Sequence, residues 1–173
     1  LGAHSHNVIS LDGQNQDALA TSRMTWFSSD GDAACAVVDL SEAYAGSALK
    51  VCRGIAMVDN RRAVLVQDEV TTAAETAVTW GITTDAEIEI ISATEARLTQ
   101  DGQSMIVHAL TPNVSFTAGD APQTEPPAYS NKGVRRLETT VSATGITTIA
   151  ILLAPKRSDG IAEYTEVNPL SEW

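Results

Sequence analysis

Two histidines near the start of the sequence are the side chains best suited to chemistry. His4 and His6 flank Ser5, and Asn7 follows them. In extended backbone, residues two positions apart point to the same face, so the two imidazoles could bind one metal ion. Zinc sites need three or four ligands, however, and the remaining histidine, His108, lies in an apolar run where a structural role is expected. The histidines therefore predict part of a metal site.

Other kinds of catalytic site are not visible in the sequence. It contains neither a Gly-x-Ser-x-Gly turn for a nucleophilic serine nor a glycine-rich phosphate loop. Cys35 and Cys52 lie in core-like runs, which favours two buried thiols and leaves one disulfide as the alternative. Tyr44, Tyr129 and Tyr164 lie among turn and loop residues, so surface roles are expected for them. We therefore assign no catalytic residue to this chain and leave its substrate-binding residues undefined.

The charge balance restricts the partners. The 173 residues include 22 acidic and 11 basic side chains, which give a formal net charge of −11. Such a surface repels nucleic acids and anionic membranes, and we exclude both as partners. No run approaches the roughly 18 apolar residues of a membrane-spanning helix. A polyanionic substrate would meet few local cations, the candidates being Arg23, Lys132, Arg135 and Arg136.

Short apolar runs rich in Val, Ile and Thr alternate with turn residues along most of the chain. Runs on either side of a tight turn predict antiparallel hairpins. Four such pairs occur: Met24 to Ser28 with Ala33 to Asp39, Lys50 to Val58 with Arg62 to Val66, Ala96 to Thr99 with Ser104 to Leu110, and Leu137 to Ser142 with Ile146 to Leu153. Only residues 40–49 look locally helical.

The alternation of side chains predicts how the strands are covered. Glu87 to Ile90 alternates charged and apolar residues, as a half-buried strand does, whereas Thr148 to Leu153 is apolar on both faces. A strand buried on both faces requires a second layer. The sequence thus predicts one all-β domain over residues 1–173, an antiparallel β-sandwich of stacked sheets built from consecutive hairpins. Residues 118–132 are expected to form a loop, and residues 156–173 a polar tail across a sheet edge.

Several segments resemble one protein family in their order and spacing. His6 to Gln16 resembles the HNT-x-x-x-DG-x-x-Q signature that opens the C-terminal β-domain of heparinase II/III-like polysaccharide lyases, a group related to alginate lyases. Asp39 to Tyr44 resembles the D-x-x-x-x-Y segment of that family, and Arg53 to Val58 with Ala63 to Val70 resembles its paired strands. Trp80 falls where a tryptophan commonly follows. The resemblance extends to about residue 155.

The resemblance implies that this chain is the C-terminal domain of a larger carbon–oxygen lyase. In the family, an N-terminal helical toroid supplies the catalytic tyrosine and the group that masks the uronate carboxylate, and the toroid is absent from this chain. The chain alone is then inactive and supplies one wall of the cleft in which a uronate-containing polysaccharide is cleaved by β-elimination. Of the metal ligands of the family, only the signature histidine has a counterpart here, His6. Zinc is expected in the full-length protein, with absent or weak binding by this chain, and the location is expected to be periplasmic or secreted.

Two alternatives remain open. A non-catalytic carbohydrate-binding β-sandwich would use exposed aromatic side chains, for which Trp26, Trp80 and Trp173 are the candidates, and Trp80 is expected in the core. A purely structural domain would have the rest of its own polypeptide as its partner. Aromatic residues make up only 5% of the chain, which argues against the first alternative.

Overall fold

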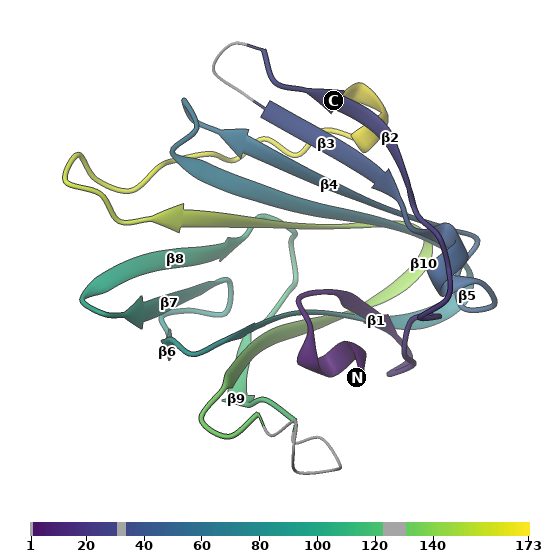
Figure 1. The fold of residues 1–173 in the computed structure, drawn as a ribbon, viewed down its shortest axis with the longest axis horizontal. Helices are drawn as coiled ribbons and strands as arrows, with labels where there is room; N and C mark the ends of the chain where they lie inside the picture. Colours follow the sequence, from purple (N-terminus) through teal and green to yellow (C-terminus); the bar gives the residue numbers. More distant parts are fainter. Residues whose placement is uncertain (1, 31–33, 123–130) are drawn as a thin grey trace.

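The regular secondary structure of the described residues consists almost entirely of antiparallel strands (Figure 1). The computed structural model describes residues 2–30, 34–122 and 131–173, and within these ranges it contains no α-helix. Three short 3₁₀ turns are present: η1 (Ala3–Ser5), η2 (Ser41–Tyr44) and η4 (Leu170–Glu172). The strands are β1 (Ile9–Leu11), β2 (Arg23–Ser28), β3 (Ala34–Asp39), β4 (Lys50–Val58), β5 (Ala63–Thr84), β6 (Glu87–Ile90), β7 (Glu95–Gln100), β8 (Gln103–Ala109), β9 (Thr117–Asp120) and β10 (Arg135–Pro155). The predicted all-β class is confirmed.

The fold is organised around two long strands, β5 and β10. They pair with each other over nearly their whole length, from Arg135 opposite Thr84 to Leu153 opposite Val64. The first half of β5 also pairs with β4 and its second half with β1, while the two halves of β10 pair with β9 and β8. The strand order is β2-β3-β4-β5-β10-β8-β7-β6, with β1 beside the second half of β5 and β9 beside the first half of β10. One hydrogen-bonded sheet thus bends into two stacked layers, open at its edges (Figure 1).

One of the predicted hairpins is wrong, because its two halves form one bent strand. Leu137 to Ser142 and Ile146 to Leu153 were expected to reverse at Ala143-Thr144-Gly145, but both belong to the single strand β10. The pairing of β10 with β5 shifts register between Ala143 and Gly145, and Gly145 has φ +69°. A glycine at positive φ suits a β-bulge as well as a turn. The bulge bends the strand from one layer into the other instead of reversing it.

The space between the layers holds the main core. It is formed by side chains from both halves of the long strands and from β1, β4, β7 and β8, among them Ile9, Leu11, Val51, Val70, Val78, Trp80, Val107, Leu137, Ile149 and Ile151. Because Ala150 and Leu152 are buried on the opposite face, residues 149–152 in the second half of β10 are covered on both sides, as predicted.

The C-terminal tail covers the outer face of the layer that contains β2, β3 and β4, which we call the larger layer, and not just an edge of it. Leu170 and Trp173 lie over Gly54 in β4, where a Cβ atom would come within 2.3 Å of the Leu170 side chain. The Gln67 amide donates to the Asn168 carbonyl at 2.8 Å, and the Leu170 N–H donates to the Glu69 carboxylate at 2.7 Å. A buried sheet face and two long-range hydrogen bonds therefore hold the tail in place.

The tight turns between consecutive strands follow the turn residues of the sequence. Asp101 and Gly102 have φ +51° and +75°, and Asp59 to Arg61 also lie in the left-handed region. Gly31 and Ala33 of the first predicted hairpin lie outside the described residues, as do Pro126, Pro127 and Tyr129. Strands β2 and β3 nevertheless pair as expected. No helix in the described part of the chain is both long and apolar enough to cross a bilayer.

The two cysteines lie too far apart to form a disulfide. Cys35 pairs across the strands with Ala56, and Cys52 pairs with Asp39, so the two thiols are four residues apart along the strand direction. At roughly 3.4 Å per residue this separation is about 13 Å, beyond the reach of a disulfide. Both thiols are free, Cys52 buried and Cys35 half-buried. The alternative of buried thiols is the correct one.

Candidate functional site

The polar residues that follow His6 fasten the opening segment to strand β5. The Asn7 side chain accepts a hydrogen bond from the Thr83 N–H at 2.7 Å. The Asp12 carboxylate accepts one from the Ala77 N–H at 2.8 Å, just beyond the end of the pairing between β1 and β5. Asp12 itself has φ +49°, in a tight turn where Asp is tolerated. These residues of the signature therefore have a structural role: they bind a sheet edge whose backbone groups would otherwise lack hydrogen-bond partners.

Tyr44 joins the same segment to the core. Its hydroxyl donates to the Ile9 carbonyl at 2.8 Å and accepts from the Gln16 amide at 2.7 Å. Tyr44 is only 5% exposed, so the predicted surface role is wrong. Burial is the main cause that raises the pKa of Tyr44, to about 12, and the nearby Asp68 carboxylate adds to it. A phenol held neutral in this way acts as a fixed donor and acceptor.

Arg53 holds the segment from the side of the larger layer. Its guanidinium forms a bidentate pair with Asp68 at 2.7 and 2.8 Å and donates to the Asn7 carbonyl at 2.8 Å. The Asp68 side chain is completely buried. Burial alone would lower the pKa of Arg53, but the Asp68 charge outweighs it and the pKa is raised. The pair is therefore a permanently charged clamp inside the fold.

Arg136 holds the preceding carbonyl from the smaller layer. It donates to the His6 carbonyl at 3.3 Å and the Thr83 hydroxyl at 3.1 Å, and it pairs with Glu138 at 2.8 Å. Its side chain lies across Gly81, where a Cβ would come within 2.1 Å of the guanidinium. Arg136 was one of the basic candidates for substrate binding. Because it is buried and fully engaged, its role is to position His6.

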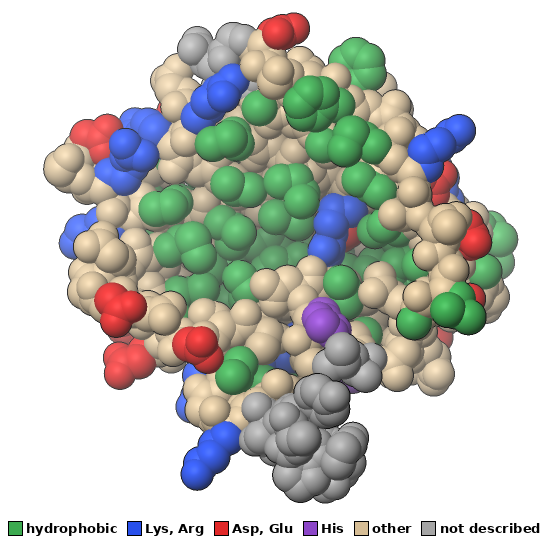
Figure 2. Space-filling model, in the orientation of Figure 1, with side chains coloured by type: hydrophobic (Ala, Val, Ile, Leu, Met, Phe, Trp, Pro, Cys, Tyr) green, Lys and Arg blue, Asp and Glu red, His purple; other side chains and the backbone are tan. Residues whose placement is uncertain are grey.

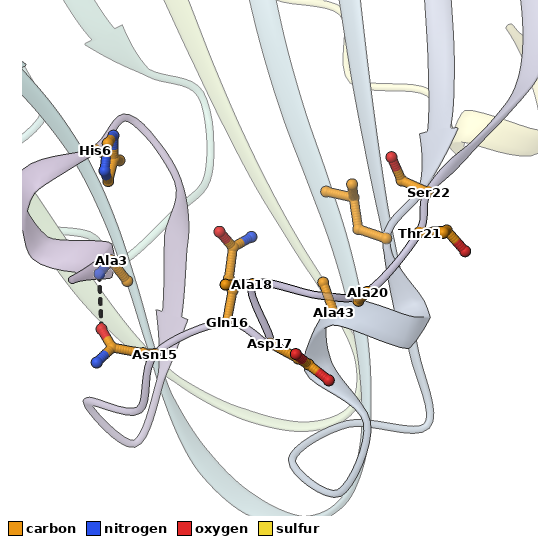
Figure 3. A pocket seen from close by; sticks show the side chains of 11 residues that line it. Ala3, His6, Asn15, Gln16, Asp17, Ala18, Ala20, Thr21, Ser22 and Ala43 are labelled. Carbon is orange, nitrogen blue, oxygen red and sulfur yellow. Dashed lines mark hydrogen bonds between the residues drawn. The ribbon is translucent and has the colours of Figure 1, made fainter. Parts of the chain in front are cut away.

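The His6 side chain, in contrast, is exposed and has no hydrogen-bond partner among the described residues. It lies at one side of a cavity of about 370 Å³ (Figure 3). In Figure 3 the Gln16 amide points up between His6 on one side and Ser22 on the other, while Thr21 and Asp17 point away. The lining is completed by small and polar residues: Ala3, Asn15, Ala18, Ala20, Leu40 and Ala43. The backbone of His6 is fixed, and its ring remains available.

The described residues do not by themselves form a metal site. No group of three or more His, Cys, Asp or Glu side chains within the described ranges lies close enough to hold an ion. His4 belongs to the 3₁₀ turn η1, so the extended spacing that would direct it to the same face as His6 is not present. His108 lies on β8, 3.9 Å from Glu95. The residues present therefore fit a zinc site only as the source of one ligand, His6.

An uncovered apolar face begins beside this cavity. Met24, Phe27, Ala36, Val38, Ile55 and Met57 share one face of β2, β3 and β4 by strand register, and we call this set the open apolar face. Along β4, exposure on this face rises from 0% at Val51 to 48% at Ile55. The smaller layer thus covers only part of it. Figure 2 shows hydrophobic side chains gathered across the middle of the viewed surface.

A small apolar pocket links the two features. It has a volume of about 230 Å³, and its lining includes Val38, Arg53 and Ile55 together with Gln16 and Leu40. Gln16 and Leu40 also line the cavity beside His6. The open apolar face and the His6 cavity therefore adjoin each other. Gln16, Leu40, Arg53 and Asp68 all lie in segments that carry the family resemblance, with Gln16 the last residue of the signature. The sequence patterns assigned them no common site, because only the folded sheet brings them together.

No family model matches the sequence, and the search of curated proteins found no match. Solved structures do share its fold. The crystal structure of heparan sulfate lyase HepC from Pedobacter heparinus superposes with a TM-score of 0.71 at 12% identity, over 88% of this chain and 24% of that chain. A structure titled as heparinase III has a TM-score of 0.66 at 16% identity, and covers 89% of this chain and 24% of its own. The heparinase III BT4657 gene product has a TM-score of 0.64 at 18% identity, over 87% and 23%.

These comparisons confirm the predicted resemblance at the level of the fold. The chain spans about a quarter of the length of the heparinase structures that it matches. Its fold is thus that of one domain of those larger lyase chains.

Proposed function

We propose that this chain is the β-domain of a polysaccharide lyase that cleaves a uronate-containing polysaccharide by β-elimination. In this proposal the domain is inactive alone and supplies one wall of the cleft, with His6 as its metal ligand. The observation that carries the proposal is the position of His6: Arg136 holds its carbonyl and Arg53 holds the carbonyl of the next residue, Asn7, while the His6 ring faces an open cavity. The shared fold with heparan sulfate lyase and heparinase III supports it.

The open apolar face supports a second domain as the partner. Met24 and Phe27 are 58% and 60% exposed, and Ile55 is 48% exposed, although all three lie on a face that elsewhere forms the core. Contiguous exposed apolar patches on a soluble chain mark interaction surfaces. Because the fold corresponds to a quarter of longer chains, we take the occupant to be another domain of the same polypeptide. That domain would reach the His6 cavity through the shared residues Gln16 and Leu40.

The chemistry of β-elimination divides naturally between two such walls. A base must remove the proton next to the uronate carboxylate, that carboxylate charge must be neutralised, and the leaving oxygen must be protonated. Within the described residues the cavity is lined by one imidazole, two amides, hydroxyls and one carboxylate, and that carboxylate, Asp17, points away from the cavity and accepts from the Leu19 N–H. In this proposal the base and the proton donor therefore come from the partner domain. A metal ion held partly by His6 would supply positive charge to the cleft.

The net charge fits the same division. At −11, the chain is a poor surface for a polyanion, and Arg136, the best placed of its basic candidates, is buried against Glu138. The partner domain would then carry most of the cations that grip the substrate. A periplasmic or secreted location, where such polymers are degraded, belongs to the same proposal.

The proposal is tested with the intact polypeptide that contains this domain. Ultraviolet absorbance of the unsaturated uronate product is followed on a panel of uronate polymers, for the parent protein and for His6→Ala. We expect activity in the parent and a loss of at least about a hundredfold in the variant, as for removal of one charge-stabilising group. His4→Ala is the matched control and should retain activity. A parent protein inactive on every uronate polymer would refute the proposal and favour a purely structural domain.

The carbohydrate-binding alternative has little support from the aromatic side chains. Trp80 is 4% exposed in the core, and Trp173 packs over Gly54. Trp26, on edge strand β2, is the tryptophan that remains exposed, at 51%. Binding modules usually need a platform of stacked rings.

A further inference from the structure

We infer that the cavity beside His6 binds an uncharged, hydroxyl-rich sugar unit, and that it rejects carboxylated and sulfated units. The inference deepens the proposed function, on which it rests, by assigning this wall of the cleft to the neutral units of the polysaccharide. It is argued from the hydrogen-bonding groups, the charge and the size of the cavity.

The groups that face the cavity are neutral donors and acceptors. The Gln16 amide donates one N–H to Tyr44, which leaves a second N–H and the carbonyl oxygen for a ligand. The Ser22 hydroxyl and the His6 ring have no partner among the described residues and lie on opposite sides of that amide (Figure 3). Hydroxyl groups of a sugar both donate and accept, so they match an amide, a hydroxyl and an imidazole together.

The charge around the cavity opposes an anion. Among the described residues its lining contains neither lysine nor arginine, and the one carboxylate among them, Asp17, accepts a hydrogen bond from the Leu19 N–H at 2.9 Å. The neighbouring Arg53 is already neutralised by Asp68. A carboxylate or sulfate entering here would lose hydration without gaining a charge-assisted hydrogen bond. Neutral sugars do not incur this cost.

The size and the wall residues also fit a sugar ring. A volume of about 370 Å³ lies within the range of small-molecule sites. Much of the cavity wall consists of small side chains, so a sugar ring can contact it without steric conflict. These residues are Ala3, Ala18, Ala20 and Ala43. Because the described lining residues include no Phe, Tyr or Trp side chain on which a sugar ring could stack, we expect millimolar affinity for the isolated chain.

The test is a nuclear magnetic resonance titration of the chain with defined sugars. Cellobiose and maltose serve as neutral probes, and glucuronate and glucose 6-sulfate as anionic probes. We expect the neutral disaccharides to shift the amide resonances of His6 and of residues 15–22 with a millimolar dissociation constant, and the anionic probes to leave them unchanged. Stronger binding of either anionic probe, or no shift with either disaccharide at concentrations well above millimolar, would overturn the inference.

Two matched variants localise the binding. Ala18→Trp fills the His6 cavity, and Ala73→Trp fills a separate polar cavity of about 420 Å³ near Asp12 and Glu75; both alanines are exposed, so the fold should tolerate either change. Ala18→Trp should weaken disaccharide binding about tenfold or more, while Ala73→Trp should leave it unchanged. Equal affinity of Ala18→Trp and the parent would place binding elsewhere and refute the site. The lyase assay on the intact protein is independent of this titration, so failure of either proposal is recognised separately.

Discussion

Replacing Gly54 with alanine should release the C-terminal tail from the sheet. Gly54 lies in the middle of β4, and an added Cβ would approach the Leu170 side chain to 2.3 Å and the Trp173 ring to 2.8 Å. Real Cβ atoms do not tolerate such distances, so the tail must move. Leu170 is 6% exposed in the native fold, and its side chain would return to water.

The magnitude follows from the burial that is lost. Exposing a leucine side chain costs about 2 kcal/mol, while alanine in a strand gains about 0.5 kcal/mol over glycine through backbone entropy. Partial loss of the Trp173 contact adds to the cost, so we expect a net loss of about 2 kcal/mol in the free energy of unfolding. At this chain length the melting temperature should fall by roughly 4–8 °C.

Urea denaturation of the parent, of Gly54→Ala and Gly119→Ala, and of a truncated chain with and without Gly54→Ala tests the reasoning. Gly119→Ala is the matched control, because nothing lies within 4 Å of its Cβ position, and it should be nearly neutral. In a chain truncated after residue 165, Gly54→Ala should have no cost, because the clashing side chains are gone. If Gly54→Ala is as stable as the parent, or costs as much in the truncated chain, the packing of the tail on β4 is wrong.

Three further predictions concern the buried polar groups. Asp68→Ala leaves the Arg53 charge buried without its partner, so urea denaturation should show a loss of about 3 kcal/mol or more; a loss below about 1 kcal/mol would contradict the buried clamp. The raised pKa of Tyr44 contributes stability that is complete below pH 10 and is lost as the pH rises from 10 to 12, and Tyr44→Phe should remove this part of the pH dependence of unfolding. Burial raises the pKa of the Cys52 thiol, so iodoacetamide should alkylate Cys35 first in the native protein, as peptide mass spectrometry would detect; equal rates would contradict the burial.

Local patterns predicted the elements whose folding depends on local signals. The hairpin at Asp101-Gly102 and the double burial of the run at residues 148–153 follow from turn chemistry and from alternation, and both are confirmed. The sequence predicts a hairpin where the structure has a bulge at Gly145, because a glycine at positive φ occurs in both kinds of structure. What decides between them is the pairing of β10 with the whole of β5, a contact more than sixty residues away.

The candidate site was predictable only in part for the same reason. The sequence identified His6, whose ring lies exposed beside a cavity, and its role as a metal ligand stays a prediction. Tyr44 was expected at the surface because turn residues surround it, yet its hydroxyl meets the Ile9 carbonyl 35 residues away. The tail was expected at an edge because it is polar, whereas Leu170 and Trp173 are directed onto a glycine that sequence patterns did not mark.

The central claim is that the open apolar face docks the rest of a lyase against the His6 cavity. Its most direct test is the specific activity of the intact polypeptide after Ile55→Glu, with Ile146→Glu as the matched control. Ile55 lies in the open apolar face, whereas Ile146 is 76% exposed at the bend of β10. A charge at Ile55 would be buried without a partner on docking, so we expect a loss of activity of about a hundredfold, with unchanged thermal stability of the isolated domain. Full activity of Ile55→Glu, or an equal loss from Ile146→Glu, would contradict the claim.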